Sequence, residues 1–326
     1  MANLETQLLD DIIVKSRRKM LSLGTAALAG LAFGGVRTAE AATTYSDSDI
    51  LNFALNLEYL EANFYTLATA GMTISQYGLG IGAGTATSGS GTVATKTGGP
   101  SACLVPWTIP AIQSYATETA QEERNHVTFL RSALSTAAVA APNIDLYTSF
   151  NTLASAAGIA STFDPFASDA NFLIGAYVFE DVGVTAYSGA APLITTPAYL
   201  AAAAGILAVE AYHAGLVRTS IFVADPTGAL GYQKYTQQIS ATRMALDGST
   251  TTDDIGVGFQ SVTLNATTNV NAATIVDAQT GSTNYSKTYV RTTTEVLKIV
   301  TGSAAPSSGG KYTGVFFPNG LNGLFS

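Results

Sequence analysis

The chain has 326 residues, of which 47% are hydrophobic and 12% are charged, so it is long enough to bury a large core in one or two domains. Its 23 acidic and 15 basic residues give a net charge of −8, without a basic cluster in the mature region. This balance excludes nucleic acid and anionic membrane surfaces as expected partners. The single cysteine, Cys103, excludes an intrachain disulfide.

Residues 1–41 are expected to be an export signal. Arg17 and Arg18 lie in a basic run before an apolar stretch, 20–33, and residues 39–41 (Ala-Glu-Ala) offer a cleavage site. The paired arginines favour the bacterial twin-arginine route, with an ordinary secretory signal as the alternative. The apolar stretch is too short to span a bilayer, so no membrane anchor is expected after cleavage. The mature protein, with a net charge of −9, would be periplasmic or secreted.

Four segments of the mature region, 42–224, have the hydrophobic period of amphipathic helices, with apolar residues at alternating spacings of three and four. The expected helices cover residues 47–70, 110–137, 168–190 and 197–223. The last one begins with a capping threonine followed by proline at the first helical position. A glutamate interrupts each of the four apolar stripes near its middle. This is the main anomaly of the sequence.

The connections and the C-terminal region contain fewer candidate functional residues than the four helical segments. The glycine-rich stretch at 78–100 is expected to be a long crossover loop, since no strand precedes it and no helix begins on it. Residues 225–326 are expected to form an extension of mixed short elements that packs on the bundle. It contains a strand-like run at 258–266 and a short helix at Thr292, where Glu295 completes a capping box. No catalytic motif is visible in this extension.

Both histidines of the chain lie three residues after a glutamate, as Glu123 with His126 and Glu210 with His213. Residues three apart on a helix are neighbours on one face, so each pair can present an oxygen and a nitrogen to one ion. The glutamates of the other two stripes, Glu58 and Glu180, would each add one carboxylate. A lone Glu from two helices and Glu-x-x-His from the other two is the ligand arrangement of dinuclear carboxylate sites in four-helix bundles.

The spacing of tyrosines supports this choice of glutamates. Tyr65 follows Glu58 by seven residues and Tyr187 follows Glu180 by seven residues, so each tyrosine lies two turns further along the same face. The order Glu, Tyr, Glu-x-x-His thus occurs twice, as expected of two helical hairpins related by an approximate two-fold axis. Each tyrosine is expected either as a packed aromatic residue or as a hydrogen-bond donor to a ligand carboxylate.

Three acidic residues near the ligands have open roles. Glu61, one turn after Glu58, is the alternative ligand of its helix or a neighbour of the ligands. Glu122 and Asp181 could orient a ligand histidine, although exposure to solvent is the more common fate of such residues.

Electrostatics separates a metal site from a set of ordinary polar residues. Burying four carboxylates without partners would cost roughly several kcal/mol of folding free energy for each. Few Lys or Arg residues lie on the same stripes to pair with them. Two divalent cations would neutralise these four charges.

The segments 50–65, 118–130, 176–194 and 205–222, which carry these motifs, resemble the ferritin-like domain family that includes plant desiccation-related and fungal stress-response proteins. The resemblance covers residues 45–224, and the closing FFPNGLNG is similar to exported members. It implies an all-α, ferritin-like four-helix bundle. It also implies that the metal ligands are Glu58, Glu123, His126, Glu180, Glu210 and His213.

The resemblance implies redox chemistry of a dinuclear centre with a small oxidant, O₂ or H₂O₂, in oxidative or desiccation stress. Two Fe ions are expected, with two Mn ions as the alternative, and the reaction would be of the ferroxidase, peroxidase or catalase type. Glu123 and Glu210 would bridge the ions, while Glu58 and Glu180 would each bind one of them. A non-catalytic stress protein with a metal-stabilised bundle and an iron-storage protein are the alternatives, and a homo-oligomer is compatible with each.

Overall fold

The computed structural model describes residues 45–325, apart from 90, 251, 266–267, 275–276 and 280–285. The predicted export signal and its cleavage site lie outside the described residues.

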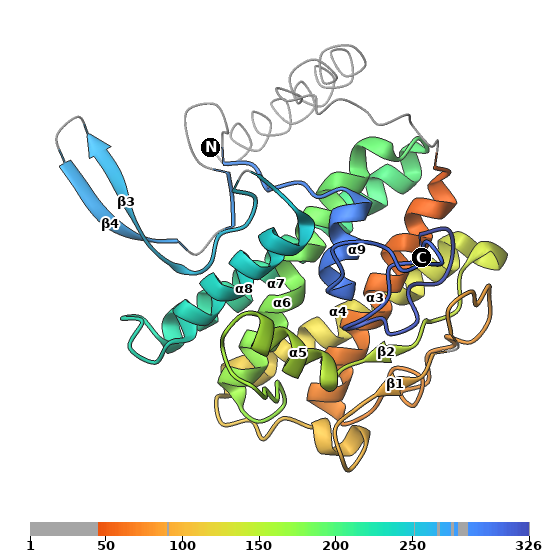
Figure 1. Cartoon of the computed structure of the whole chain (residues 1–326), viewed down its shortest axis with the longest axis horizontal. Coiled ribbons are helices and arrows are strands. Elements are labelled where there is room, and N and C mark those ends of the chain that lie inside the picture. Colours follow the sequence, from red (N-terminus) through yellow and green to blue (C-terminus); the bar gives the residue numbers. More distant parts are fainter. Residues whose placement is uncertain are drawn as a thin grey trace, which may run out of the picture. The chain divides into compact units, whose positions relative to one another are not determined.

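Four long helices pack side by side as a bundle (Figure 1): α3 (Asp47–Ala70), α4 (Pro110–Leu134), α6 (Asp169–Ala190) and α7 (Pro197–Ala224). Helix α3 packs mainly on α4, and α6 packs mainly on α7, so the bundle consists of two hairpins. The helix boundaries agree with the predicted ones to within three residues. The largest difference is at α4, which ends at Leu134, and a 3₁₀ turn, Ser135–Ala137, completes the predicted segment. The predicted all-α bundle is confirmed.

The two hairpins begin in the same way. Ser46 caps α3 by accepting a hydrogen bond from the Asp49 N–H at 3.2 Å, and Ser168 caps α6 by accepting one from the Asn171 N–H, also at 3.2 Å. A side-chain oxygen at this position satisfies a backbone donor that has no partner within the helix. The two hairpins therefore carry the same start signal.

The first residue of each of these helices also holds the start of a helix in the other hairpin. The Asp47 carboxylate accepts a hydrogen bond from the Thr195 N–H (2.9 Å) just before α7, and Asp169 accepts one from the Thr108 N–H (3.0 Å) just before α4. Carboxylates are favourable at helix N-termini because of the exposed N–H groups there. These reciprocal contacts support the predicted two-fold repeat.

Two long connections pack against each other beside the bundle. The glycine-rich connection from α3 to α4 contains β1 (Val93–Ala94) and a 3₁₀ turn (Pro100–Cys103), and the connection from α4 to α6 contains β2 (Ile144–Asp145) and α5 (Thr148–Ala156). Strands β1 and β2 pair in parallel. Gly84 has φ +121°, and a Cβ atom there would overlap the Ala138 carbonyl oxygen, so glycine allows the two connections to meet.

The C-terminal extension contains α8 (Tyr232–Asp247), an antiparallel hairpin of β3 (Gly258–Asn265) and β4 (Thr268–Thr274), and α9 (Thr293–Thr301). Helix α9 has the predicted capping box between Thr292 and Glu295. The extension adds buried residues such as Ile239 and Val296 to the hydrophobic core of the bundle. Helix α8 was not predicted from the sequence.

The C-terminal tail docks on the bundle and on both connections. Asn322 exchanges two hydrogen bonds with Asn56 of α3, each of 2.9 Å, and donates a third to the Ala140 carbonyl at 2.8 Å. Phe316 and Phe317 beside it are at most 2% exposed. The apolar tail is therefore part of the core.

Candidate metal centre

All six predicted ligands lie together in the middle of the bundle. Helix α3 supplies Glu58, α6 supplies Glu180, and α4 and α7 supply the two Glu-x-x-His pairs. The four carboxylate residues are at most 1% exposed. The donor atoms form two groups, one around His126 and one around His213, which share Glu123 and Glu210.

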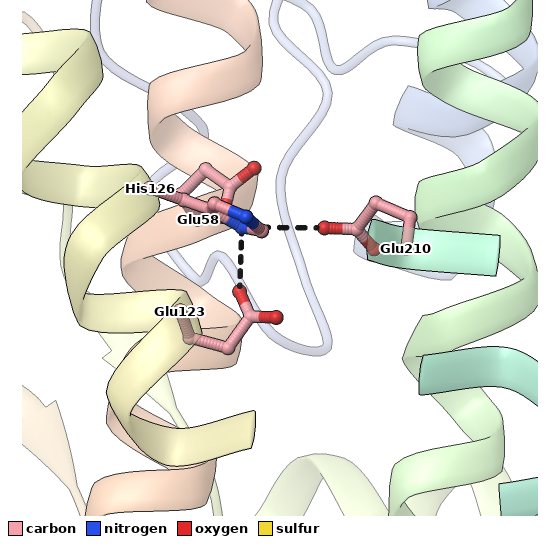
Figure 2. Close-up of side chains that lie close together, drawn as sticks. All are labelled: Glu58, Glu123, His126 and Glu210. Carbon is pink, nitrogen blue, oxygen red and sulfur yellow. Dashed lines mark hydrogen bonds and ion pairs between the residues drawn. The ribbon is translucent and has the colours of Figure 1, made fainter. Parts of the chain in front are cut away.

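The first group surrounds the His126 imidazole. Its Nδ1 lies 3.2 Å from Glu58 Oε2, 3.7 Å from Glu123 Oε2 and 3.6 Å from Glu210 Oε1. Figure 2 shows these side chains pointing toward one another from three helices. The four donor atoms lie within 4.8 Å of one another, which is close enough to bind one cation.

The second group surrounds the His213 imidazole. Its Nδ1 lies 3.0 Å from Glu123 Oε1 and 3.6 Å from Glu180 Oε2, and Glu210 completes the set of four donors. Because Glu123 turns one oxygen to each histidine, it lies between the two groups, where a bridging carboxylate would be expected. The arrangement repeats the first group with the two hairpins exchanged.

The two tyrosines connect the hairpins through the ligand carboxylates. The Tyr65 hydroxyl of α3 donates a hydrogen bond to Glu180 Oε1 of α6, and the Tyr187 hydroxyl of α6 donates one to Glu58 Oε1 of α3. Of the two roles left open by the sequence, the structure supports that of hydrogen-bond donor. Each tyrosine fixes the orientation of one carboxylate and leaves its other oxygen directed to a histidine.

Burial and mutual repulsion shift the pKa values of these carboxylates. Burial raises the pKa of Glu58 to about 7, and burial together with the charges of Glu123 and Glu61 raises that of Glu210 well above its usual range. Burial also opposes ionisation of Glu123, but the adjacent His126 and His213 lower its pKa to about 2. Burial disfavours the His126 cation, yet Glu58 and Glu123 raise its pKa to about 11. Protons therefore supply the missing positive charge when no metal is bound.

The donor atoms fit a metal ion better than they fit each other. Both oxygens of Glu123 and Glu210, one of Glu180 and the Nδ1 atom of His213 are buried without a hydrogen bond of acceptable geometry. Within the described part of the chain, no lysine or arginine forms an ion pair with these carboxylates. Unpaired buried carboxylates are costly, and a set of carboxylate and imidazole donors is suited to iron or manganese. The cluster is therefore compatible with a metal centre.

The structure places the three acidic residues whose roles were open. Glu61 is buried (5% exposed) beside the centre, but only Glu58 of this helix belongs to a group of four donors within mutual reach. Glu122 Oε2 lies 2.7 Å from His213 Nε2, so Glu122 contacts a predicted ligand histidine from outside the centre, and its side chain is 31% exposed. Asp181 contacts no histidine and is not exposed to solvent; it is 1% exposed and pairs with arginines.

Asp181 belongs to a second buried polar site, which we call the arginine cluster. The sequence did not predict this site. It joins the bundle to the extension through buried aspartate and arginine side chains. Its members are Asp181, Arg218, Arg243, Asp247, Asp253, Asp254 and Arg291. The sequence signal for it was that the extension has only two arginines, and both lie in the cluster.

Comparison with known proteins agrees with this geometry. Residues 46–222 match the ferritin-like domain family. The chain is 31% identical over 223 residues to the desiccation-related protein PCC13-62 of Craterostigma plantagineum, a match that covers 65% of this chain and 66% of the plant protein. It is 25% identical over 285 residues to the ferritin-like catalase Nec2 of Nesocodon mauritianus, covering 85% of this chain and 84% of that protein.

No solved structure matches the chain significantly. The family match covers more than half of the chain and spans all four helices that surround the buried carboxylates. The chain therefore belongs to the ferritin-like domain family.

Proposed function

We propose that this protein is an oxidoreductase that decomposes hydrogen peroxide at a dinuclear centre of iron or manganese. The observation that carries the proposal is the pair of four-donor groups sharing Glu123 and Glu210, whose buried oxygens accept no hydrogen bond from any described residue. A relative named as a ferritin-like catalase supports peroxide as the substrate. The chemistry is disproportionation, in which two molecules of peroxide give two of water and one of oxygen.

The metal pair would supply the two electrons that one peroxide takes up and the next one returns. The chain itself holds and orients the ligands. Glu123 and Glu210 would contact both ions, Glu58 and Glu180 one ion each, and the two histidines would each offer Nδ1. The tyrosine hydroxyls restrict the rotation of Glu58 and Glu180, which keeps the ligand geometry fixed during turnover.

The space beside the centre favours a small substrate. A cavity of about 10 Å³ lies next to Tyr65, Thr119 and His213, between α4, α6 and α7. This volume is about that of one water-sized molecule. Such a space favours a substrate of very few atoms, such as peroxide or oxygen, over a larger organic molecule.

Oxygen release from peroxide tests the proposal directly. Apo protein would be loaded with Mn²⁺ or Fe²⁺, and metal content and oxygen evolution would be measured together for wild type and for Glu210→Gln. We expect close to two ions per wild-type chain and oxygen evolution that depends on them, with both lost in the variant. Metal binding without turnover would favour the non-catalytic stress protein, and large particles that accumulate iron would favour storage.

We also propose that the protein acts outside the cytoplasm. The basic run with Arg17 and Arg18, the apolar stretch after it and the small residues at 39–41 support export. Replacement of both arginines with lysine should leave the precursor in the cytoplasm. Unchanged export of this variant would instead indicate the general secretory route.

A further inference from the structure

The two-fold repeat of the metal centre is broken at two positions. Glu58 and Tyr65 have their counterparts 122 positions later, as Glu180 and Tyr187, and at the same spacing Glu61 corresponds to Gly183. The Glu-x-x-His pairs are related by 87 positions, and at that spacing Glu122 corresponds to Val209. The hairpin of α3 and α4 thus has two acidic residues where the hairpin of α6 and α7 has a glycine and a valine.

Gly183 makes room for this asymmetry. A Cβ atom at Gly183 would overlap Glu210 Oε2 and would lie 3.6 Å from Glu61 Oε1. Any larger residue there would displace the Glu210 carboxylate, whereas its distance to Glu61 would be that of an ordinary contact. The glycine therefore lets Glu210 keep its position with Glu61 beside it.

Glu61 is free to face a cation. It is 5% exposed, and within the described residues no group donates a hydrogen bond to its carboxylate. Glu61 therefore adds a carboxylate beside Glu210, which both groups of donors share.

Glu122 acts on the His213 side of the centre. Its Oε2 atom lies 2.7 Å from His213 Nε2, the ring nitrogen that faces away from the centre. A carboxylate that accepts the second N–H of a ligand histidine fixes the ring and makes it a stronger ligand. The apolar side chain of Val209 cannot do this for His126, whose contacts with described carboxylates all use Nδ1.

We propose that the two metal positions are unequal, and that the ion at His213 binds first and more tightly than the ion at His126. This inference rests on the proposed metal centre but not on its catalysis. Glu122 strengthens the imidazole ligand of the His213 position. The His126 position lacks such a partner, and its imidazole is also the more accessible one, with a side-chain exposure of 10% against 0% for His213.

A binding titration tests the inequality. Apo protein would be titrated with Mn²⁺, with heat followed by calorimetry and bound Mn²⁺ by electron paramagnetic resonance. We expect two resolved events of one ion each. Glu122→Gln should weaken the first event about 10- to 100-fold, the usual range for such a partner, and leave the second nearly unchanged. Glu61→Gln should instead affect both events, because Glu61 lies beside Glu210, which both positions share.

Two further variants assign the events and control for charge. His126→Ala should remove the weaker event and keep the tight one, whereas His213→Ala should remove the tight one. Glu118→Gln removes a charge one turn before Glu122, where an exposed glutamate accepts a hydrogen bond from Tyr212, and should change neither event.

Two equal sites in wild type, or equal weakening of both events by Glu122→Gln, would overturn the inference while leaving catalysis intact. Two unequal sites without peroxide turnover would instead overturn the proposed function and leave this inference standing. If neither Mn²⁺ nor Fe²⁺ binds to the wild type, both are wrong.

Discussion

Glu180 and Asp181 are consecutive residues of α6, each is 1% exposed, and they enter two different polar sites. Glu180 faces the interior of the bundle, where its neighbours are His213 and Tyr65. Asp181 faces the extension, where Arg218 and Arg243 each lie 3.0 Å from its Oδ2 atom. The same helix thus places one carboxylate in the metal centre and the next in the arginine cluster.

The two sites differ in where their positive charge comes from. In the arginine cluster, Asp254 accepts hydrogen bonds from the guanidinium groups of Arg243 (2.7 Å) and Arg291 (2.9 Å). Three arginines there face four aspartates. In the metal centre, five buried carboxylates face only two histidines. The chain therefore supplies most of the positive charge of the arginine cluster itself, whereas two histidines fall well short of five carboxylates, a deficit that bound cations would fill.

Breaking the arginine cluster should have the largest effect on stability. Arg243→Met leaves Asp181 and Asp254 short of a buried partner, which typically costs about 3–5 kcal/mol. Urea unfolding of wild type and variant, each with metal and with chelator, should show this loss in both conditions because the cluster uses no metal.

Arg124→Met provides the matched control. The Arg124 guanidinium lies 4.1 Å from the ring centre of Tyr77, a contact worth about 1 kcal/mol. A loss for Arg243→Met that occurred only in the metal-loaded protein would show that the two sites are not independent.

Removal of a ligand charge should have the next largest effect, and its sign should depend on metal. Glu210→Gln keeps the shape of the side chain but removes a charge and a shared oxygen, so bound metal and its stabilisation of about 4 kcal/mol at saturating concentrations should be lost. In metal-free protein the variant relieves repulsion among buried carboxylates and should melt at the same temperature as wild type or higher. Equal destabilisation with and without metal would show that Glu210 supports the fold through protein contacts.

The difference between the two polar sites also explains which of them could be predicted from the sequence. The metal centre was visible because a glutamate stands out on an apolar stripe, and because spacings of three and seven are fixed by helix geometry. Its six residues could therefore be brought together without knowledge of the tertiary structure. Their role as ligands stays a prediction.

The arginine cluster was hidden for the opposite reason. Helix α8 turns polar residues inward, among them Gln233, Thr236, Ser240 and Arg243, so it has no apolar stripe to indicate a helix. Asp181 finds its partners at positions 218 and 243, and a single sequence does not show which distant charges meet. Exposure was therefore the wrong expectation for Asp181.

The pH dependence of stability should distinguish the two sites. His126 has a folded pKa of about 11 against an ordinary value of 6.5, so its stabilising effect is complete below pH 6.5 and is lost as pH rises toward 11. The pKa of Glu58, raised to about 7, adds a loss of stability between pH 4.5 and 7. Metal-free protein should therefore melt at a lower temperature at pH 8.5 than at pH 6.

Bound metal should reverse this slope. Metal needs deprotonated imidazoles and carboxylates, so the loaded protein should instead lose stability as the pH falls. At the arginine cluster, pairing raises the pKa of Arg243 and lowers that of Asp254, while burial and the charges of Asp181 and Asp254 raise the pKa of the adjacent Asp277, so any pH dependence from this site should be the same with and without metal. If melting temperatures of loaded and metal-free protein change in parallel with pH, the titrating groups do not belong to a metal site.

The smallest effects are expected from tyrosine hydroxyls, which occur in both sites and so allow a matched comparison. Tyr187→Phe removes the hydrogen bond to Glu58, and Tyr177→Phe removes one with Ser240 (2.8 Å) and one from Arg218 (3.2 Å). Each variant should lose about 1–2 kcal/mol of unfolding free energy, since a buried hydrogen bond to a charged group is worth about that much.

Only Tyr187→Phe should also weaken metal binding, by about tenfold, because Glu58 would then rotate more freely and hold its ion less firmly. Metal affinity and urea unfolding, measured on both variants, separate the two effects. A similar fall in metal affinity for Tyr177→Phe would show that the loss reflects general loosening of α6, which carries both tyrosines, and would contradict a specific role of Tyr187 in orienting a ligand.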